Sequence, residues 1–231
     1  MSKIKVFFTS DEHYSHRNIL KYCKRPFDSV EEMNEEMINR HNEVVGEKDW
    51  VYHIGDFYCG KDKQEAKDIF NRLNGNKVLI KGNHDKKIVL SLPWKQVHDV
   101  IHLKLKSVPN AHLEGEVFLS HYAHRVWNKS YHEIGHLFGH SHGGLDFYRR
   151  SFDIGVDCHN FYPISWERVQ DYFDVLGVII EMKLDAEKIR QELKEDPQSE
   201  FGEWMKSLKQ KEGICIKSIM SRYGIQNEKE L

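Results

Sequence analysis

The first 80 residues alternate between short apolar runs and amphipathic helical segments, and few folds accommodate that order. The apolar runs at residues 3–10, 50–54 and 77–80 have the length and composition of buried strands. Between them, residues 29–45 begin with the capping-box sequence Ser-Val-Glu-Glu, and residues 63–73 carry apolar side chains at helical spacing. A strand–helix–strand–helix–strand order, with helices long enough for crossover connections, favours an α/β fold with helices packed on a sheet.

The chain changes character after the third apolar run. Short strand candidates at residues 100–105, 116–119, 136–138 and 154–156 are separated by loops. Short strands with loop connections are closer to an antiparallel or mixed sheet than to a parallel one. A core that contains two sheets fits both halves of this pattern.

From about residue 181 the composition becomes charged and helix-prone, with Pro197 as a breaker between helical stretches. We therefore predict a main domain over residues 1–180 and a helical C-terminal appendix over residues 181–231. Residues 214–225 (ICIKSIMSRYGI) faintly resemble half of a helix-turn-helix motif. A helix pair that covers a sheet edge or forms a homodimer contact is the favoured interpretation.

Composition excludes several classes of protein. Hydrophobic residues make up 39% of the 231-residue chain, which is enough for a packed core. The net charge of −2 argues against extended nucleic-acid binding. The four cysteines form no CxxC pair, so neither a disulfide framework nor a thiolate zinc site is expected. With no apolar run near the ~20 residues of a membrane helix, we expect a cytoplasmic protein that does not associate with membranes.

Histidine is used unevenly along the chain. All fifteen histidines lie between His13 and His159, and six of them fall between His121 and His142. Histidines that served only as ordinary surface residues would be scattered more evenly along the chain. Clusters of neutral imidazoles most commonly bind metal ions.

The apolar runs themselves end in clusters of ligand-type side chains. These clusters are Asp11-Glu12-His13, Gly55-Asp56, Gly82-Asn83-His84-Asp85, Ser120-His121 and Gly139-His140-Ser141-His142. The carboxyl ends of strands in open α/β sheets meet at one crevice, so loops distant in sequence can gather there. A mixed oxygen and nitrogen ligand set without thiolates suits manganese, iron, zinc or nickel.

In this order, the motifs Asp-x-His, Gly-Asp, Gly-Asn-His-Asp, His and Gly-His-x-His resemble those of the calcineurin-like metallophosphoesterase family. The resemblance covers roughly residues 4–165. The segments His16-Arg17-Asn18 and residues 51–57 are similar to a small bacterial and phage-type subgroup of that family. The implied fold is a two-sheet β-sandwich flanked by helices, which agrees with the two-sheet core expected above.

The resemblance also implies roles for particular residues. One divalent cation would be held by Asp11, His13 and His142. A second would be held by Asn83, His121 and His140. The carboxylate of Asp56 would bridge the two cations. Mn²⁺ is the favoured metal, with iron, zinc or nickel as alternatives. A hydroxide that bridges the cations would attack phosphorus in line. His84 would donate a proton or hydrogen bond to the leaving oxygen, and Asp85 would orient His84.

Other residues near the motifs are weaker candidates. His16, Arg17 and Asn18 follow the first motif and could contact substrate at the rim of the site. His124 and Arg125 follow His121; an arginine there could clamp a phosphate, although a surface salt bridge is an equally good interpretation.

Several residues are better explained without a role in the site. Glu12 should point away from its two neighbours, and His53 is better explained as a core histidine. Cys59 is better explained as a buried, inert thiol.

The favoured function is hydrolysis of a phosphate ester, with a phosphodiester and possibly a nucleotide as substrate. One alternative is a DNA or RNA nuclease of the same family, against which the near-neutral charge argues. The other is a scaffold that kept the fold and lost catalysis. The presence of His84 and of every ligand position argues against that scaffold.

Overall fold

The structure is a computed structural model that describes residues 3–181 of the chain. The chain divides into two compact units, Met1–Trp166 and Glu167–Leu231. The helices predicted beyond residue 181 lie outside the described residues, and the boundary between residues 180 and 181 stays a prediction. Within residues 3–181, no helix combines the length and the apolar character that crossing a membrane requires.

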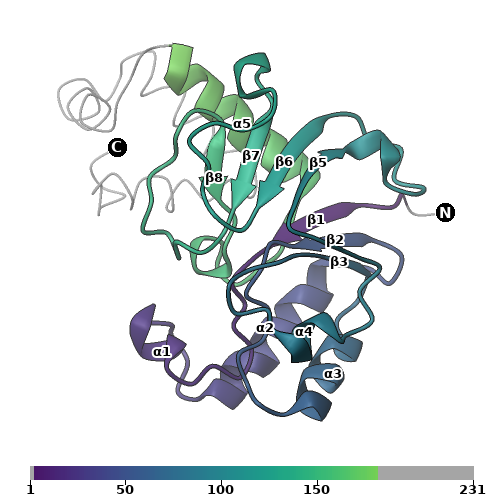
Figure 1. Ribbon diagram of the computed structural model, residues 1–231, viewed down its shortest axis with the longest axis vertical. Helices are drawn as coiled ribbons and strands as arrows, with labels where there is room; N and C mark the ends of the chain where they lie inside the picture. Colours follow the sequence, from purple (N-terminus) through teal and green to yellow (C-terminus); the bar gives the residue numbers. More distant parts are fainter. Residues whose placement is uncertain (1–2, 182–231) are drawn as a thin grey trace. The chain divides into compact units, whose positions relative to one another are not determined.

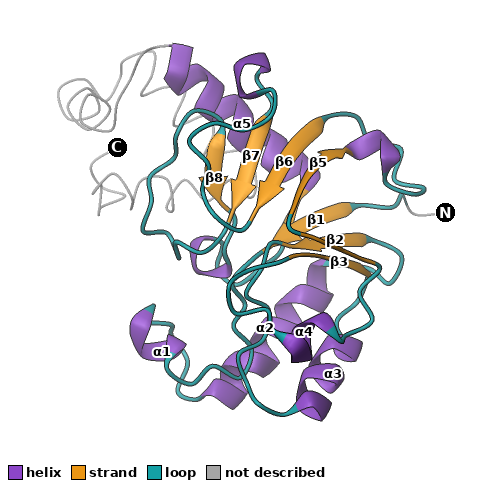
Figure 2. Ribbon diagram, in the orientation of Figure 1, coloured by secondary structure: helices purple, strands orange, loops and turns teal. Residues whose placement is uncertain are grey.

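The first unit contains the predicted α/β sheet (Figure 2). Its strands are β1 (Val6–Thr9), β2 (Trp50–His53), β3 (Asn76–Ile80), β4 (Gln96–His98) and β9 (Ile164–Ser165), in the order β4-β3-β2-β1-β9. The first four strands of that order pair in parallel, and β9 pairs antiparallel with β1. The strands β1, β2 and β3 are the three apolar runs from which the fold class was predicted, and the α/β class is confirmed.

A second sheet of mixed direction follows, as the loop-separated strand pattern predicted. It contains β5 (Val100–Lys104), β6 (Glu116–Ser120), β7 (Gly135–Phe138) and β8 (Ser151–Asp153), in that order. Strand β5 pairs antiparallel with β6, whereas β6–β7 and β7–β8 are parallel. Two sheets flanked by helices are the architecture that the family resemblance implied.

The strand predicted at residues 154–156 is wrong, because the last strand of this sheet ends at Asp153. The apolar side chains of Ile154 and Val156 are buried for another reason. The chain crosses there to the first sheet, where Val156 N donates to the Ser10 carbonyl (2.9 Å) and Gly155 forms a bridge with Ser10. Burial of an apolar run on both sides does not by itself distinguish a strand from a crossing segment.

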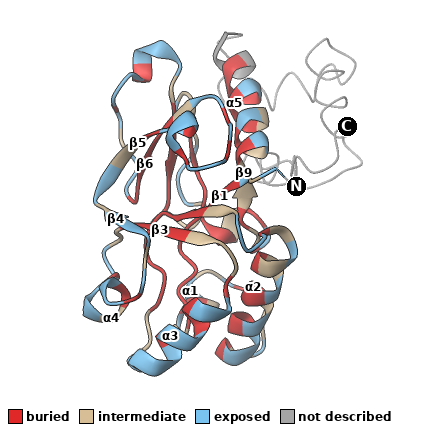
Figure 3. Cartoon of the chain, turned by 90° about the vertical axis from the view of Figure 1, so that its right-hand side faces the viewer, coloured by how far each residue is buried: buried red, intermediate tan, exposed pale blue. Residues whose placement is uncertain are grey.

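The predicted helices form beside the first sheet. Helix α2 (Val30–Val44) begins at Ser29, whose hydroxyl accepts from Glu32 N (3.0 Å), and α3 (Lys63–Arg72) begins at Asp62, whose carboxylate accepts from Gln64 N (2.7 Å). Their apolar faces pack in one core cluster that includes Met33, Met37, Ile69 and Phe70. The exposed faces of both helices point away from the buried strands (Figure 3).

Shorter elements complete the described chain. They are the helices α1 (Ile19–Tyr22) and α4 (Lys87–Leu90) and the 3-10 turns at Leu105–Ser107, Ser130–His132 and Val156–Cys158. Helix α5 (Trp166–Glu181) begins at the end of the first unit and belongs almost entirely to the second.

The parallel register brings distant loops to one edge of the first sheet (Figure 1). Thr9 pairs with His53, and His53 pairs with Leu79, so β1, β2 and β3 end side by side. The second sheet joins this edge through the Ser10–Gly155 bridge. The loops that carry the predicted ligands therefore lie close together.

Candidate metal centre

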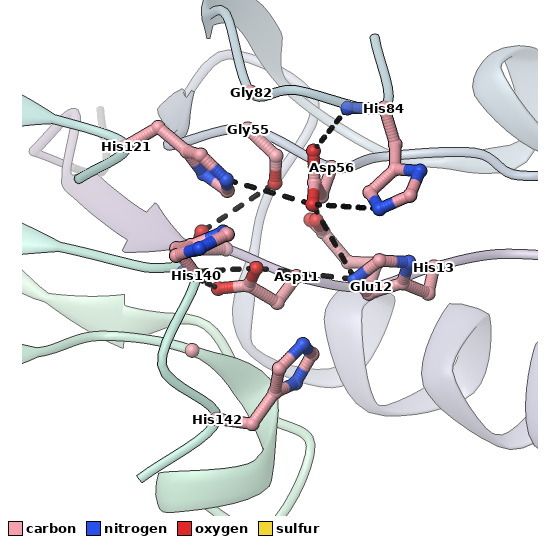
Figure 4. A network of polar contacts seen from close by, with 12 residues as sticks. Asp11, Glu12, His13, Gly55, Asp56, Gly82, His84, His121, His140 and His142 are labelled. Atoms are coloured by element: carbon pink, nitrogen blue, oxygen red, sulfur yellow. Dashed lines mark hydrogen bonds and ion pairs between the residues drawn. The ribbon is translucent and has the colours of Figure 1, made fainter. Parts of the chain in front are cut away.

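Imidazole rings from several loops surround two carboxylates at this edge (Figure 4). The carboxylates are those of Asp11 and Asp56, and the rings are those of His13, His84, His121, His140 and His142. The loops after β1, β2, β3, β6 and β7 each contribute to the cluster. Convergence of strand ends therefore places the predicted side chains in one site.

Asp11, His13 and His142 form one candidate group of ligands. One side-chain atom from each lies within 4.8 Å of the others, and the first two residues are buried. His140 N donates to both carboxylate oxygens of Asp11, at 3.0 and 2.9 Å, which orients that carboxylate. These residues are the set that the resemblance implied for one cation.

Asp56, His121 and His140 form a second candidate group, again with one atom of each within 4.8 Å of the others. Asn83 belongs beside them, because its Oδ1 lies 3.1 Å from His121 Nε2. His121 Nδ1 donates to the Ile54 carbonyl (2.9 Å), so Nε2 is the nitrogen directed at Asn83 and Asp56. The structure thus gathers the four residues expected around the second cation and its bridge.

Asp56 stands between the two groups. Its Oδ2 is 3.6 Å from His13 Nε2 and 3.5 Å from His121 Nε2. Both distances exceed those of good hydrogen bonds. Two ligand atoms bound ~2.1 Å from one cation lie roughly 3.0–3.4 Å apart at tetrahedral to octahedral angles. The two spacings around Asp56 lie just above that range and are close to the separation of ligands that share a cation.

The environment of His13 fits a metal ligand. Its Nε2 is buried with no hydrogen-bond partner, whereas Nδ1 contacts Cys59 Sγ at 3.1 Å. Leaving a buried polar nitrogen unpaired is costly unless a cation uses its lone pair. Burial lowers the pKa of His13 to about 3, so the ring is neutral at pH 7, as a ligand must be.

The pKa values of the two carboxylates, Asp56 and Asp11, are shifted in opposite directions. Burial would raise the pKa of Asp56, but the adjacent His121 ring, the hydrogen bond from the His84 backbone N–H and the charge of His13 together outweigh it and lower that pKa to about 2. Burial, followed by the charge of nearby Asp153, raises the pKa of Asp11 to about 7. A divalent cation would neutralise this repulsion and keep Asp11 ionised. The donor set therefore fits bound divalent cations.

The backbone of the candidate ligands is unusual. The φ angles of Asp11, His13, Asp56, His140 and His142 are 60°, 51°, 58°, 67° and 47°. Left-handed φ is uncommon in residues other than glycine, and such strain concentrates at functional sites. Contacts between loops hold these conformations, such as Asp11 N to the Gly55 carbonyl and His13 N to the Asp56 carbonyl, each 3.0 Å.

Sequence reasoning missed two residues that support this site. Asp157 accepts from His142 Nδ1 (2.8 Å), which leaves Nε2 of that ring available for a cation. Arg25 donates to both oxygens of Asp157, at 2.8 Å each, and to the Asp11 carbonyl at 2.7 Å. The only sequence signal is an acidic residue directly after the buried run Ile154–Val156, and it does not identify a partner.

Burial would lower the pKa of His142, but the Asp157 carboxylate outweighs it and raises that pKa to about 10. The ring is therefore protonated when no cation is bound. A cation at Nε2 would displace that proton while the Nδ1–H bond to Asp157 stays in place.

His84 and Asp85 occupy the loop after β3. The His84 side chain is 47% exposed, and its Nε2 lies 4.0 Å from Asp56 Oδ2. The Asp85 carboxylate accepts from the backbone N–H groups of Asp56, Phe57 and Gly82, at 2.9, 3.0 and 2.8 Å. Among the described residues these amides are its hydrogen-bond partners, so Asp85 fixes the loop that carries His84 and does not hold the ring directly.

The candidate substrate residues after the first motif lie in different surroundings. The ring of His16 is 5.3 Å from that of His13 and 6.5 Å from that of His84. Arg17 is exposed and pairs with Glu31 at 3.6 Å, and Asn18 directly precedes α1 without a capping hydrogen bond from its side chain. Of the three, His16 lies beside the candidate metal ligands.

His124 and Arg125, the candidate residues after His121, also lie in different surroundings. His124 packs against Phe118 and His136, with ring centroids 5.3 and 5.5 Å away. Arg125 is exposed and makes no ion pair within residues 3–181. The salt bridge considered for Arg125 is therefore absent from the described part of the chain, while its phosphate contact stays a prediction.

Two histidines outside the candidate ligand set, His53 and His136, have structural partners. His53 Nδ1 contacts Glu12 Oε1 at 2.6 Å in the interior, so Glu12 does point away from the ligands. His136 contacts the hydroxyls of Ser120 and Ser151 at 2.8 and 2.9 Å and is fully buried. His53 is therefore a core histidine, as its place in the second apolar run predicted, and His136 is a core histidine as well.

A two-sheet α/β fold with this cluster at its strand ends defines a class of metal-dependent phosphoesterase. The family model of the calcineurin-like phosphoesterases matches residues 4–224. The chain belongs to that family, as the order of its motifs predicted.

The chain is similar in sequence to an archaeal protein and to a phage protein. The chain is 49% identical over 87 residues to the uncharacterized protein MJ1445 of Methanocaldococcus jannaschii, a match that spans 37% of this chain and about half (49%) of that protein. It is 25% identical over 180 residues to the Gene 66 protein of Mycobacterium phage L5, covering 66% of this chain and 86% of that protein. These relatives are consistent with the predicted small subgroup.

A solved structure has a similar fold. The protein of unknown function AQ665 from Aquifex aeolicus has a TM-score of 0.57 at 21% identity. The match covers 73% of this chain and 99% of that one.

Proposed function

We propose that this protein hydrolyses phosphodiesters, with nucleotides as the favoured class, by in-line attack of a water-derived nucleophile at a site with two cations. The position of Asp56 carries the proposal. Its carboxylate lies 3.6 and 3.5 Å from imidazole nitrogens of the two candidate ligand groups. A carboxylate with a nitrogen ligand on each side is suited to bridge two cations that share one phosphate.

We divide the ligands between the two cations as the family resemblance implied. Asp11, His13 and His142 would hold one cation, Asn83, His121 and His140 the other, and Asp56 both. When bound, the cations would supply an activated nucleophile and neutralise charge on the phosphoryl oxygens. Carboxylate, amide and imidazole ligands favour Mn²⁺, with iron, zinc and nickel as alternatives.

His84 is proposed as the group that protonates the leaving oxygen. Its backbone N–H donates to Asp56 Oδ1 at 2.8 Å, which ties its position to the bridging carboxylate. The ring is half exposed beside the ligands, so it can reach a bound substrate. Asp85 contributes indirectly, because it holds the loop of His84 to the loop of Asp56.

The free thiols of Cys23 and Cys59 fit a reducing compartment, and a cytoplasmic location is part of the proposal.

The test is turnover of bis-p-nitrophenyl phosphate and p-nitrophenyl phosphate by metal-free protein with and without added Mn²⁺. We expect Mn²⁺-dependent cleavage, faster for the diester. His84→Ala should lower kcat about 10²- to 10⁴-fold, the usual contribution of a positioned general acid. His132→Ala is the matched control, because that histidine is exposed and belongs neither to the candidate ligands nor to the candidate substrate residues, so turnover should stay unchanged. Cleavage of neither ester, or full activity of His84→Ala, would refute the mechanism.

A further inference from the structure

A cavity of about 810 Å³ adjoins His84. Its walls are residues 58–61, from the loop after β2, and residues 86–90, which include α4. These walls lie outside the candidate ligand set. The cavity is nevertheless continuous with the site through His84, which lines it.

The charges on these walls are all of one sign. Lys61, Lys86 and Lys87 line the cavity, are exposed, and make no ion pair with any residue in the described range 3–181. The remaining lining side chains include no carboxylate. A concave surface of uncompensated positive charge attracts anions.

Another lysine-lined cavity shows the contrast. The cavity of about 540 Å³ beside Lys104, Lys106 and Lys129 also contains Glu114 and Glu116. There Lys129 Nζ pairs with Glu116 Oε2 at 2.8 Å. The carboxylates of that cavity therefore offset part of its lysine charge, whereas no carboxylate lines the cavity beside His84.

The position of the cavity relative to the site is fixed by buried contacts. The Asp85 carboxylate bonds Gly82 N on one loop and Asp56 N and Phe57 N on the other. These are the loops from which the two cavity walls continue. The lysines are consequently presented at a defined place next to Asp56 and His84.

From these observations we infer that the cavity binds a second phosphate, carried by the leaving group of the substrate. The inference rests on the proposed function and narrows its substrate class to nucleotides whose released nucleoside bears its own terminal phosphate. Ile88, Val89 and Leu90 give the same cavity an apolar wall suited to the body of that nucleoside.

The reaction balances without another reactant. The oxygen of water forms a bond to the scissile phosphorus as the bond from phosphorus to the leaving oxygen breaks. The leaving oxygen takes a proton from His84, and the proton lost by water later restores His84. The released nucleoside keeps its terminal phosphate, which the lysines hold until the product departs.

The test compares three deoxydinucleotides with Mn²⁺-loaded protein: one without a terminal phosphate, one with a 5′-phosphate and one with a 3′-phosphate. Product analysis shows which nucleoside leaves. We expect kcat/KM to be at least about tenfold higher for the dinucleotide whose terminal phosphate stays on the leaving nucleoside, since charge-assisted contacts are strong. Lys61→Ala/Lys86→Ala/Lys87→Ala should bring that ratio close to one, and the corresponding triple arginine variant should restore it.

The matched control is Lys104→Ala/Lys106→Ala, which removes lysines from the other cavity and should keep the wild-type ratio. Bis-p-nitrophenyl phosphate separates the two hypotheses. If the wild type cleaves it but shows no preference among the dinucleotides, the inference fails and the proposed function stands. If the wild type cleaves none of these esters, both are wrong.

Discussion

Asp157 and Arg25 show how much of this site depends on residues that bind no cation themselves. Arg25 is buried and bonds Asp157, Asp11 and Glu12 at once. Asp157 in turn holds Nδ1 of His142. One charged pair therefore positions both the loop of Asp11 and the ring of a candidate ligand.

Asp157→Asn tests this arrangement. The amide keeps the shape of the carboxylate but removes the charge that makes His142 a strong ligand. We expect Mn²⁺ affinity to fall about 10- to 100-fold, the usual effect of losing such a partner. Titration calorimetry on the metal-free protein measures it directly.

Asp99→Asn is the matched control for that titration. Asp99 pairs with Lys81 at the surface, with its side chain 84% exposed. Its loss should leave the affinity unchanged. Equal affinities for Asp157→Asn and the wild type would show that Asp157 does not support the metal site.

At the scale of elements, helix α2 packs its buried residues into the core cluster beside the first sheet. The sequence predicted residues 29–45, and the helix spans Val30–Val44 because Ser29 serves as its N-cap. Glu32 Oε2 also accepts from Asp28 N at 2.7 Å, so the start of the helix is held from both directions. Local hydrogen bonding of this kind is readable from four consecutive residues.

Ser29→Ala should therefore lower the free energy of unfolding by about 1 kcal/mol, the typical cost of losing an N-cap. Urea unfolding of the metal-free protein, followed by circular dichroism, gives the difference. Ser29→Asn keeps a capping oxygen and should unfold close to the wild type. An Ala variant as stable as the Asn variant would mean that the cap contributes nothing.

Elements that lack such local signals were missed or displaced. Strand β4 (Gln96–His98) lies at the edge of the first sheet, and β9 (Ile164–Ser165) is very short. Neither strand is long enough to show the two-residue alternation of apolar and polar side chains that identifies a strand. The apolar residues 154–156 were predicted as a strand, although they cross between the two sheets. A buried strand and a buried crossing segment both appear in the sequence as a short apolar run.

For the molecule as a whole, buried neutral histidines contribute a loss of stability in acid. Burial lowers the pKa of His41 and of His136 to about 3. In the unfolded chain a histidine has a pKa of about 6.5. As the pH falls from about 6.5 toward 3, the unfolded state therefore binds protons that the folded state does not, and stability decreases.

Each of these two histidines should lower the stability of the metal-free protein by about 1.4 kcal/mol per pH unit in that window. His136→Gln should reduce the change in the free energy of unfolding per pH unit by the contribution of one proton, when unfolding is measured between pH 7 and pH 5. His132→Gln replaces an exposed histidine and should keep the wild-type slope. An unchanged slope in His136→Gln would contradict the assignment.

The family and the candidate ligands were readable from the sequence because each motif is local. A strand end, a glycine and a polar side chain occupy neighbouring positions, and the motif order follows the order of strands. The roles of Asp85, Arg25 and Asp157 were not readable in this way. Arg25 and Asp157 are separated by 132 positions along the chain, and no local sequence pattern near either residue predicts that the two pair.

The sequence by itself determined the kinds of side chain available for chemistry and the strands that carry them. Only the tertiary structure decided how those strands are placed. It sets the left-handed backbone at the candidate ligands, the pairing of Asp157 with His142, and the uncompensated lysines beside His84. Local preferences depend on near neighbours, whereas buried charge pairs and cavities depend on contacts between segments that meet only when the whole unit folds.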